Sequence, residues 1–180
     1  MASLDTVNIL LQAGVVGAGL LSGLFFIFSF CVMKALNTQP PASAIATMNS
    51  INAVIVNPPF MLVFMGTPIV CAVLLGFCIN EGFGVSIDNK LAAAGSLVLL
   101  IGEFVLTLAV HIPKNNALAA YLPGSSGNDD LSTWAKYYIT WTAWNHVRMM
   151  ASVATVALLS SALQLRATRL ASERQSTQMR

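Results

Sequence analysis

Four long apolar stretches constrain the fold of this chain more than any other feature of its sequence. They run through residues 9–33, 59–79, 91–112 and 137–165, and each reaches the length of roughly 20 residues that a helix needs to cross a bilayer. Each stretch is expected to be helical because a bilayer cannot hydrate exposed backbone groups. None shows the alternation typical of a transmembrane β-strand. We therefore predict an all-α bundle of four transmembrane helices.

The composition supports a membrane environment. Charged residues make up 9% of the 180 residues and hydrophobic residues 56%, whereas a soluble domain carries about 25% charged residues. This hydrophobicity excludes a disordered chain, and three cysteines are too few for a disulfide scaffold. The net charge of +2 argues against a nucleic-acid partner. The bilayer is the expected partner, so polar residues inside the apolar stretches become the most informative ones.

The connections between the stretches predict the rest of the architecture. Residues 42–56 follow two prolines and are expected to form a short surface helix between the first and second spans. Residues 123–130, with the sequence PGSSGNDD, are expected to form a loop before the fourth span. We predict a single domain over residues 1–165, followed by a polar, mobile tail over residues 166–180.

Basic residues near the span ends predict the orientation. Four spans place both termini on one side, and the basic residues on that side outnumber those on the other. The terminal side carries Lys90, Arg166, Arg169, Arg174 and Arg180, and the other carries Lys34, Lys114 and Lys136, with Arg148 near the start of the fourth span. We therefore predict a multi-pass protein with both termini in the cytoplasm.

The first span contains the small-residue motif GxxxG at Gly19 and Gly23. Small residues at this spacing let a neighbouring helix approach closely. Packing within the chain is the favoured interpretation, and a homo-oligomer formed through this face is the alternative.

Polar and aromatic residues gather at the ends of the spans that lie away from the termini. By topology these segments meet at one membrane face, where a helical bundle commonly forms a pocket. The candidate binding and catalytic residues there are Asn52, His111, Asn115, Asn116, Trp141, Trp144, Asn145, His146 and Arg148. Trp141 and Trp144 have two interpretations, as pocket walls for an aromatic ligand or as an interfacial belt.

Two charged residues lie clearly inside the spans. Arg148 shares a helix face with Trp141 and Asn145 and is expected to face the bundle interior or to snorkel toward the surface. It could bind an anionic or enolate oxygen, or it could pair with Glu103 or Asp129 or anchor at lipid headgroups.

Glu103 lies near the middle of the third span, four residues before Thr107 and eight before His111. A carboxylate inside a membrane is a candidate functional group. Glu103 could relay a proton, or it could be a neutral carboxyl group that bonds to a neighbouring helix.

The two histidines of the chain, His111 and His146, fall toward the same membrane face. Histidine is the best general base available near neutral pH, although a pair of histidines could instead hold a haem or another metal. No metal-binding motif such as HExxH or CxxCH is present. We predict a base or hydrogen-bonding role in preference to a metal site.

Four segments in order resemble the DUF1772, or anthrone oxygenase-like, membrane family. They are residues 23–29 (GLFFIFS), 48–60 (MNSINAVIVNPPF), 112–118 (IPKNNAL) and 141–148 (WTAWNHVR). The family is named for members that oxidise anthrones to anthraquinones. The resemblance implies a four-helix membrane fold and an oxidoreductase of the monooxygenase type. The residues that match the family's polar pattern are Asn52, Asn115, Asn116, Trp141, Asn145, His146 and Arg148.

An anthrone carries an acidic CH2 group, and its enolate can react with O2 without a metal or flavin. Such an enzyme needs a base and donors for the enolate oxygen. The hypothesis from sequence is that His146 is the base, while Arg148 with Asn145 or Asn116 holds the oxyanion. No cofactor other than O2 is expected. The alternatives are a non-enzymatic tetraspan that binds a lipid, quinone or pigment or serves as a subunit, and a haem- or metal-binding oxidoreductase using His111 and His146.

Overall fold

A computed structural model of the chain describes residues 4–80, 86–124 and 129–179. The described chain is helical and contains four helices long and apolar enough to cross a membrane, which confirms the predicted fold class. These helices are Thr6–Leu36, Pro58–Asn80, Ile87–Ala119 and Asp130–Gln178.

Each span is built from α-helix, in two cases interrupted by wider π-helical turns. The first span consists of α1 (Leu4–Ile27), η1 (Phe28–Val32) and α2 (Met33–Leu36), and the second is α4 (Pro58–Asn80). The third consists of α5 (Ile87–Leu99), η2 (Leu100–Val105), η3 (Thr107–His111) and α6 (Ile112–Ala119), and the fourth is α7 (Asp130–Gln178). The predicted surface helix is α3 (Pro41–Val54).

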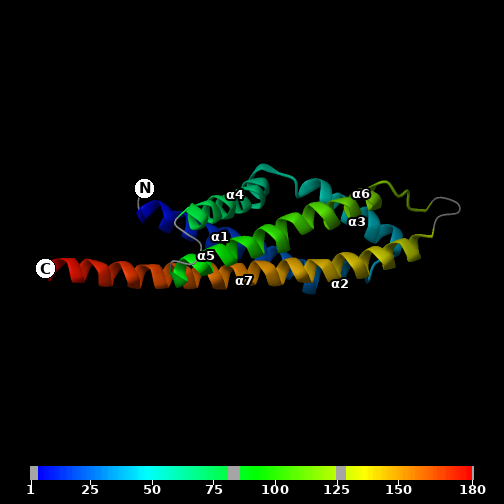
Figure 1. Cartoon of the computed structure of the whole chain (residues 1–180). Helices are drawn as coiled ribbons and strands as arrows, with labels where there is room; N and C mark the ends of the chain where they lie inside the picture. The colour runs from blue at the N-terminus through cyan, green and yellow to red at the C-terminus, as the bar shows by residue number, and fades with distance from the viewer. Residues whose placement is uncertain (1–3, 81–85, 125–128, 180) are drawn as a thin grey trace.

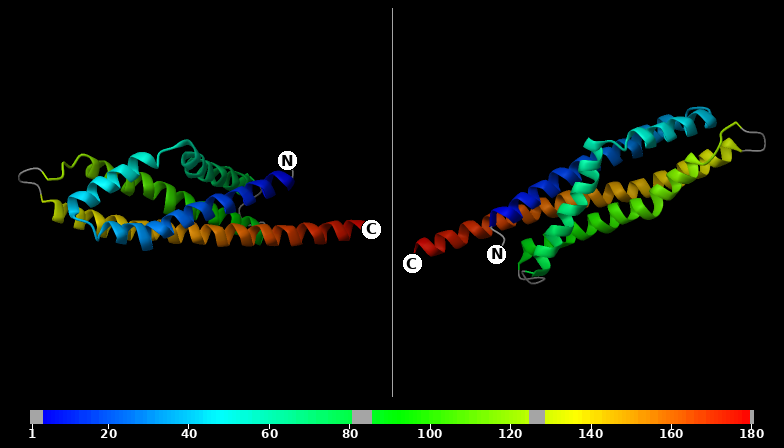
Figure 2. Two further views of the ribbon diagram at one scale, coloured as in Figure 1. Left: turned by 180° about the vertical axis from the view of Figure 1, so that it is seen from behind. Right: turned by 90° about the horizontal axis from the view of Figure 1, so that it is seen from above.

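The helix α7 runs the full length of the molecule, and both termini lie at one end while α3 and α6 lie at the other (Figure 1). The helices α1 and α5 run along α7, and α4 packs against both of them (Figure 2). The helix continues through residues 166–178, where the sequence predicted a mobile polar tail. Residues 171–179 are exposed, and the mobility of this segment stays a prediction.

The buried apolar side chains form separate clusters along the length of the bundle. Near the termini, apolar side chains of the four spanning helices pack together, among them Leu11, Leu74, Leu99 and Leu159. Many large apolar side chains instead face outward, and Leu62, for example, is 75% exposed. Because such side chains are costly to expose to water, their outward position fits a surface that contacts lipid.

Gly17, and not the predicted glycine pair, lies tightly against α4. A Cβ atom added at Gly17 would overlap the side chain of Thr67, whereas one added at Gly19 or Gly23 would meet nothing within 4 Å. The expectation that Gly19 and Gly23 mediate packing within the chain is therefore wrong. The homo-oligomer through their face stays a prediction.

We predict that Gly17→Ala destabilises the bundle and that Gly19→Ala does not. The added methyl group at Gly17 must displace Thr67, whose hydroxyl donates to the Val63 carbonyl oxygen at 2.8 Å, so overpacking should cost about 1–3 kcal/mol. The free energy of unfolding from detergent micelles, followed by circular dichroism, measures the difference. Equal stability of the two variants would contradict this account of the α1–α4 contact.

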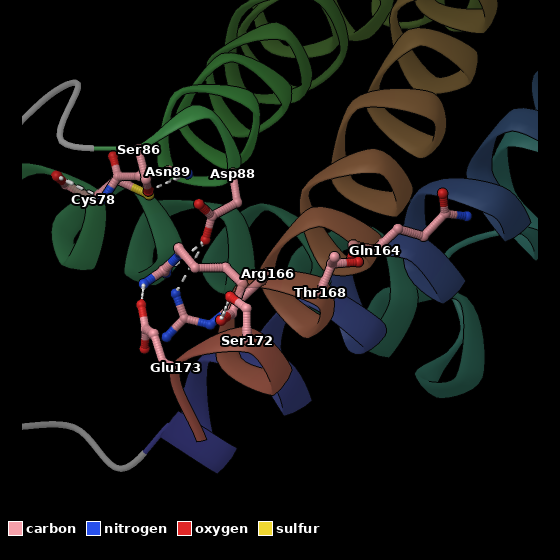
Figure 3. A network of polar contacts seen from close by, with 10 residues as sticks. Cys78, Ser86, Asp88, Asn89, Gln164, Arg166, Thr168, Ser172 and Glu173 are labelled. Atoms are coloured by element: carbon pink, nitrogen blue, oxygen red, sulfur yellow. Dashed lines mark hydrogen bonds and ion pairs between the residues drawn. The ribbon is translucent and has the colours of Figure 1, made fainter. Parts of the chain in front are cut away.

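An ion-pair cluster ties the end of α7 to the beginning of α5 (Figure 3). The buried Oδ2 atom of Asp88 lies 2.8 Å from Nη2 of Arg169 and 3.7 Å from Nη1 of Arg166. Arg166 is buried, and Arg169 also pairs with the exposed Glu173 at 3.3 Å. Asp88 therefore compensates a buried guanidinium group, and the cluster joins α7 at Arg166 and Arg169 to the first turn of α5.

Asp88→Asn is expected to lower the free energy of unfolding by about 3 kcal/mol, because it leaves the buried Arg166 without its carboxylate. The control is Glu173→Gln, which removes an exposed partner of the same cluster and should cost less than about 1 kcal/mol. Thermal unfolding of both variants in the same detergent checks this, and a control that costs as much as Asp88→Asn would refute the assignment.

Candidate functional site

The end of the bundle away from the termini carries α3 (Figure 1), and a cavity of about 310 Å³ is lined in part by α3 and the third span. Its volume is at the lower end of the range of about 300–1,000 Å³ that is common for ligand pockets. Most of its lining is apolar and comes from α1 and η1, from α3 and the link that follows it, and from α4. These apolar residues include Leu24, Phe25, Phe28, Met48, Ile51, Ile55, Val56, Phe60, Met61, Phe64 and Met65.

The polar lining of this cavity comes from α3, the third span and α7. It consists of Asn52, Thr107, His111, Asn115 and Arg148, with Trp141 beside them. No carboxylate lines the cavity, so Arg148 is the charged side chain that it presents. The cavity is therefore suited to an apolar body that carries a polar or anionic group.

Arg148 is held in place by neutral groups. It is 6% exposed, and its Nη2 donates to Oδ1 of Asn145 at 2.6 Å while its Nη1 donates to Oγ1 of Thr107 at 3.2 Å. Its guanidinium carbon also lies 4.3 Å from the ring centre of Phe25 and 5.4 Å from that of Trp141, distances typical of cation–π contacts.

Arg148 forms no ion pair in the described part of the chain, where the carboxylates within 4.0 Å of a basic group belong to Asp88 and Glu173. The alternatives that paired Arg148 with Glu103 or Asp129 are therefore not what the structure shows. Asp129 instead caps α7 by accepting from the backbone N–H of Ser132 at 2.9 Å. A buried cation without a carboxylate partner can bind an anionic ligand.

Asn145 does not line the cavity, but it forms a hydrogen bond with the cavity-lining residue Arg148. This fully buried amide donates to the backbone carbonyl of Phe25 and to Oγ of Ser29, both at 2.8 Å, and accepts from Arg148. The Phe25 carbonyl and Ser29 lie where α1 gives way to the π-helical turn η1. Asn145 thus joins the first and fourth spans and fixes the position of Arg148.

Asn115 organises the other side of the polar end. Its Oδ1 accepts from Tyr137 Oη at 2.9 Å and from Trp141 Nε1 at 3.0 Å. Its Nδ2 donates to Oδ1 of Asn52 at 3.1 Å, while the buried Nδ2 of Asn52 has no partner among the described residues. The side-chain amide of Asn115 therefore joins three segments that are distant in the sequence. The amide group of Asn52 lies in the cavity lining.

His111 lies at the end of η3 and is 1% exposed. Its ring meets that of Trp141 edge to face, with the centres 5.1 Å apart. Within the described chain, neither ring nitrogen makes a hydrogen bond of good geometry. Because His111 also lines the cavity, its imidazole lies beside the space that a ligand would occupy.

Glu103 lies below the cavity and does not line it. Its side chain is 0% exposed, and neither carboxyl oxygen has a hydrogen-bond partner in the described structure. Its backbone carbonyl accepts from Thr107 Oγ1 at 2.7 Å, the same hydroxyl that accepts from Arg148. This contact joins Thr107 to the backbone of Glu103 and leaves the carboxyl group without a partner in the described structure.

The remaining predicted site residues lie outside the cavity lining. His146 is half-buried, with its ring 5.4 Å from that of Phe30. Trp144 is 43% exposed, and Asn116 is exposed. The roles predicted for these three residues stay predictions, because the structure does not bring them together with Arg148 and His111.

Sequence reasoning missed part of the support of the site. Ser29 was not singled out, although it is a polar residue inside the first apolar stretch, and that position was the available signal. The apolar cavity wall from α3 and α4 could not be recognised in the sequence, because methionine, isoleucine and phenylalanine residues like these occur in any apolar helix.

The described residues contain no cluster of three or more His, Cys, Asp or Glu side chains that could hold a metal ion. The haem or metal alternative built on His111 and His146 stays a prediction.

These features define a multi-pass helical membrane protein with a mostly apolar pocket near one end. The family model described as anthrone oxygenase matches residues 60–158, more than half of the chain. The chain therefore belongs to the anthrone oxygenase family, as the resemblance of its motifs predicted. No curated protein and no solved structure matches it.

Asn145→Ala is expected to lower the free energy of unfolding by about 1–3 kcal/mol, because it leaves a buried carbonyl and a buried guanidinium group with fewer partners. The matched control is His146→Ala at the adjacent position, which removes a half-buried ring. Denaturation of both proteins in detergent checks this. If His146→Ala were the more damaging change, the supporting role of Asn145 would be wrong.

Proposed function

We propose that this protein oxidises a small, flat, apolar aromatic substrate of the anthrone type to the corresponding quinone, with O2 as co-substrate. The observation that carries the proposal is that His111 and Arg148 both line the polar part of a mostly apolar cavity. Neither residue is engaged by a carboxylate among the described residues. Membership of the anthrone oxygenase family supports the same reaction class.

The cavity suits such a substrate in shape and polarity. The aromatic rings would lie among the apolar residues of α3 and α4, where Phe60 and Phe64 stack with centres 5.4 Å apart. The substrate carbonyl would face Arg148 and the amide group of Asn52. Ring burial would supply the affinity, and the polar end would set the orientation.

The chemistry begins with removal of a proton from the CH2 group opposite the carbonyl. His111 accepts this proton, and the electron pair of the C–H bond moves into the ring system to give an enolate. Arg148 stabilises the negative oxygen, because a charged donor held in an apolar site is worth far more than in water. The enolate passes one electron to O2, and the two radicals combine to a peroxide. Protonation and loss of one water molecule then leave the new carbonyl.

His111 is a better candidate for the base than His146, to which sequence reasoning assigned the role. His111 lines the cavity together with Arg148, whereas His146 packs against Phe30. A general base must come within hydrogen-bonding distance of the proton that it removes. The position of His111 in the cavity lining supports this role.

Binding without catalysis is the second candidate, favoured by the apolar wall of the cavity. A lipid, quinone or pigment could occupy the same space. The two candidates differ in turnover, because a binding protein would hold an anthrone without consuming O2.

His111→Gln is expected to lower kcat for emodin anthrone about a hundredfold or more, since glutamine keeps a polar side chain but cannot act as the base. His146→Ala is the matched control and should keep near wild-type turnover. Purified protein in lipid nanodiscs is assayed under O2 and under argon, and quinone formation is followed by absorbance.

Two results would count against this mechanism. Equal turnover by wild type and His111→Gln, with His146→Ala inactive, would move the base to His146. Binding of the anthrone by the wild type without O2-dependent quinone formation would favour the non-enzymatic candidate.

A further inference from the structure

A cluster of buried apolar and aromatic residues lies between the cavity and the end of the bundle that carries α3 and α6. Its members in the described structure are Met33, Leu36, Ala44, Ile45, Met48, Leu118, Trp134, Tyr137 and Trp141. Met48 and Trp141 also line the cavity, and the other members lie farther along the same spans and along α3 toward that end. The Asn49 amide joins α3 to α6 there by donating to the Leu118 carbonyl oxygen at 3.3 Å. A ligand that came from this end would have to pass through a packed core.

The link between α3 and α4, residues 55–57, forms a thin part of the cavity wall. These three residues are not helical. Ile55 and Val56 line the cavity, and Val56 is at the same time 65% exposed. A single segment of chain therefore separates the cavity from the outside of the bundle at this point.

A surface groove of about 400 Å³ adjoins the cavity at the same link. Phe28, Ile51 and Ile55 line both the groove and the cavity. The other residues of the groove are Ser50, Val54 and Asn57, and Val54 is 70% exposed. The three shared apolar side chains thus stand between the cavity and the surface.

Local hydrogen bonds hold the link. The backbone N–H of Asn57 donates to the Ile55 carbonyl oxygen at 2.8 Å, and the link's other hydrogen bonds in the described structure also stay within residues 51–61. By contrast, Asn52, one turn earlier in α3, accepts from Asn115 of the third span at 3.1 Å. The link can therefore shift without breaking a hydrogen bond to another span.

The groove lies where the span α4, which starts at Pro58, begins to cross the membrane. Exposed apolar side chains continue on the neighbouring spans, with Leu62 on α4 and Val105 and Leu108 on the third span. A flat apolar compound dissolves in the bilayer because removing its surface from water is favourable. The groove therefore meets the compartment in which such a compound concentrates.

We propose that a flat, uncharged substrate enters the cavity sideways from the bilayer, through the groove and past Phe28, Ile51 and Ile55. The inference rests on the proposed function in taking the ligand to be such a compound. It narrows the substrate class, because a charged compound is costly to place in the bilayer beside the groove. The negative oxygen then forms only inside the cavity, beside Arg148.

The test uses the order of two steps, blocking the groove and loading the cavity. Val54→Cys is made in a Cys31→Ser background, because Cys31 is the exposed native cysteine, and a bulky maleimide is attached in detergent. Val54 lines the groove but not the cavity, so the label should obstruct passage without occupying the site. The ligand is anthraquinone, which, unlike the hydroxyanthraquinone alizarin, carries no charge. The amount that stays with the protein through gel filtration is measured by absorbance.

Protein labelled before loading should take up about tenfold less anthraquinone in a fixed short time than unlabelled protein, and protein labelled after loading should keep its ligand about tenfold longer. The matched control is the same label at Leu62→Cys, which is exposed on α4 outside both linings and should change neither quantity. The label at Ile112→Cys tests a rival entrance, because Ile112 lines the cavity from the third span and is 40% exposed.

The source of the ligand is tested with a bimane fluorophore on Val54→Cys in nanodiscs. Nitroxide-labelled lipids should quench it strongly and aqueous iodide weakly. Bimane on Gln175→Cys, exposed near the end of α7, should show the reverse. Stronger quenching by iodide at Val54→Cys would place the groove in water and overturn entry from the bilayer.

The outcomes separate this inference from the proposed function. Equal loading and retention with and without the label at Val54→Cys, or an effect of the label at Ile112→Cys alone, overturns this entrance and leaves the proposed function standing. Loss of the ligand in both orders shows that the label weakens binding, and it overturns the entrance equally. Order-dependent loading in a protein that forms no quinone under O2 supports the entrance and overturns the proposed function. Failure of unlabelled protein to bind anthraquinone overturns both.

Discussion

The cost of burying Arg148 organises this end of the molecule. A guanidinium group withdrawn from water needs compensation, and the structure provides it with the Asn145 amide, the Thr107 hydroxyl and two aromatic rings in place of a direct ion pair. These neutral partners position the cation without cancelling its charge. The charge therefore remains available to a ligand in the cavity, which a salt bridge would have prevented.

At the polar end, two amide side chains join segments that are distant in the sequence. Asn145 connects α7 to α1, and Asn115 connects the third span to α3 and α7. The opposite side of the cavity is built from flexible methionines and from aliphatic and aromatic side chains, including Met48, Met61 and Met65. A fixed polar end and an adaptable apolar wall would orient a flat substrate by its carbonyl while tolerating variation in its rings.

Much of the fold could be predicted from the sequence, because the bilayer requires long apolar helices and the few polar residues stand out against them. The rotation of each helix about its own axis could not be predicted from the sequence. This rotation decides which polar residues line the cavity together. A spacing of four residues drifts by about 40° per step in a regular α-helix, but the π-helical segments η2 and η3 widen the turns. Glu103, Thr107 and His111 are consequently all buried. Between the two histidines, only packing distinguishes His111 in the cavity from His146 beside Phe30.

The central claim, that Arg148 receives a negative oxygen in the cavity, is tested most directly by the discrimination between charged and neutral ligands. Affinities of wild type and Arg148→Gln for alizarin and for anthraquinone are compared in nanodiscs, with Lys114→Gln as a control for a cation outside the cavity lining. A charged hydrogen bond is worth about 1.5–3 kcal/mol. Arg148→Gln should therefore bind the alizarin anion about ten- to a hundredfold more weakly and anthraquinone as the wild type does. An unchanged ratio of the two affinities in Arg148→Gln would contradict the account.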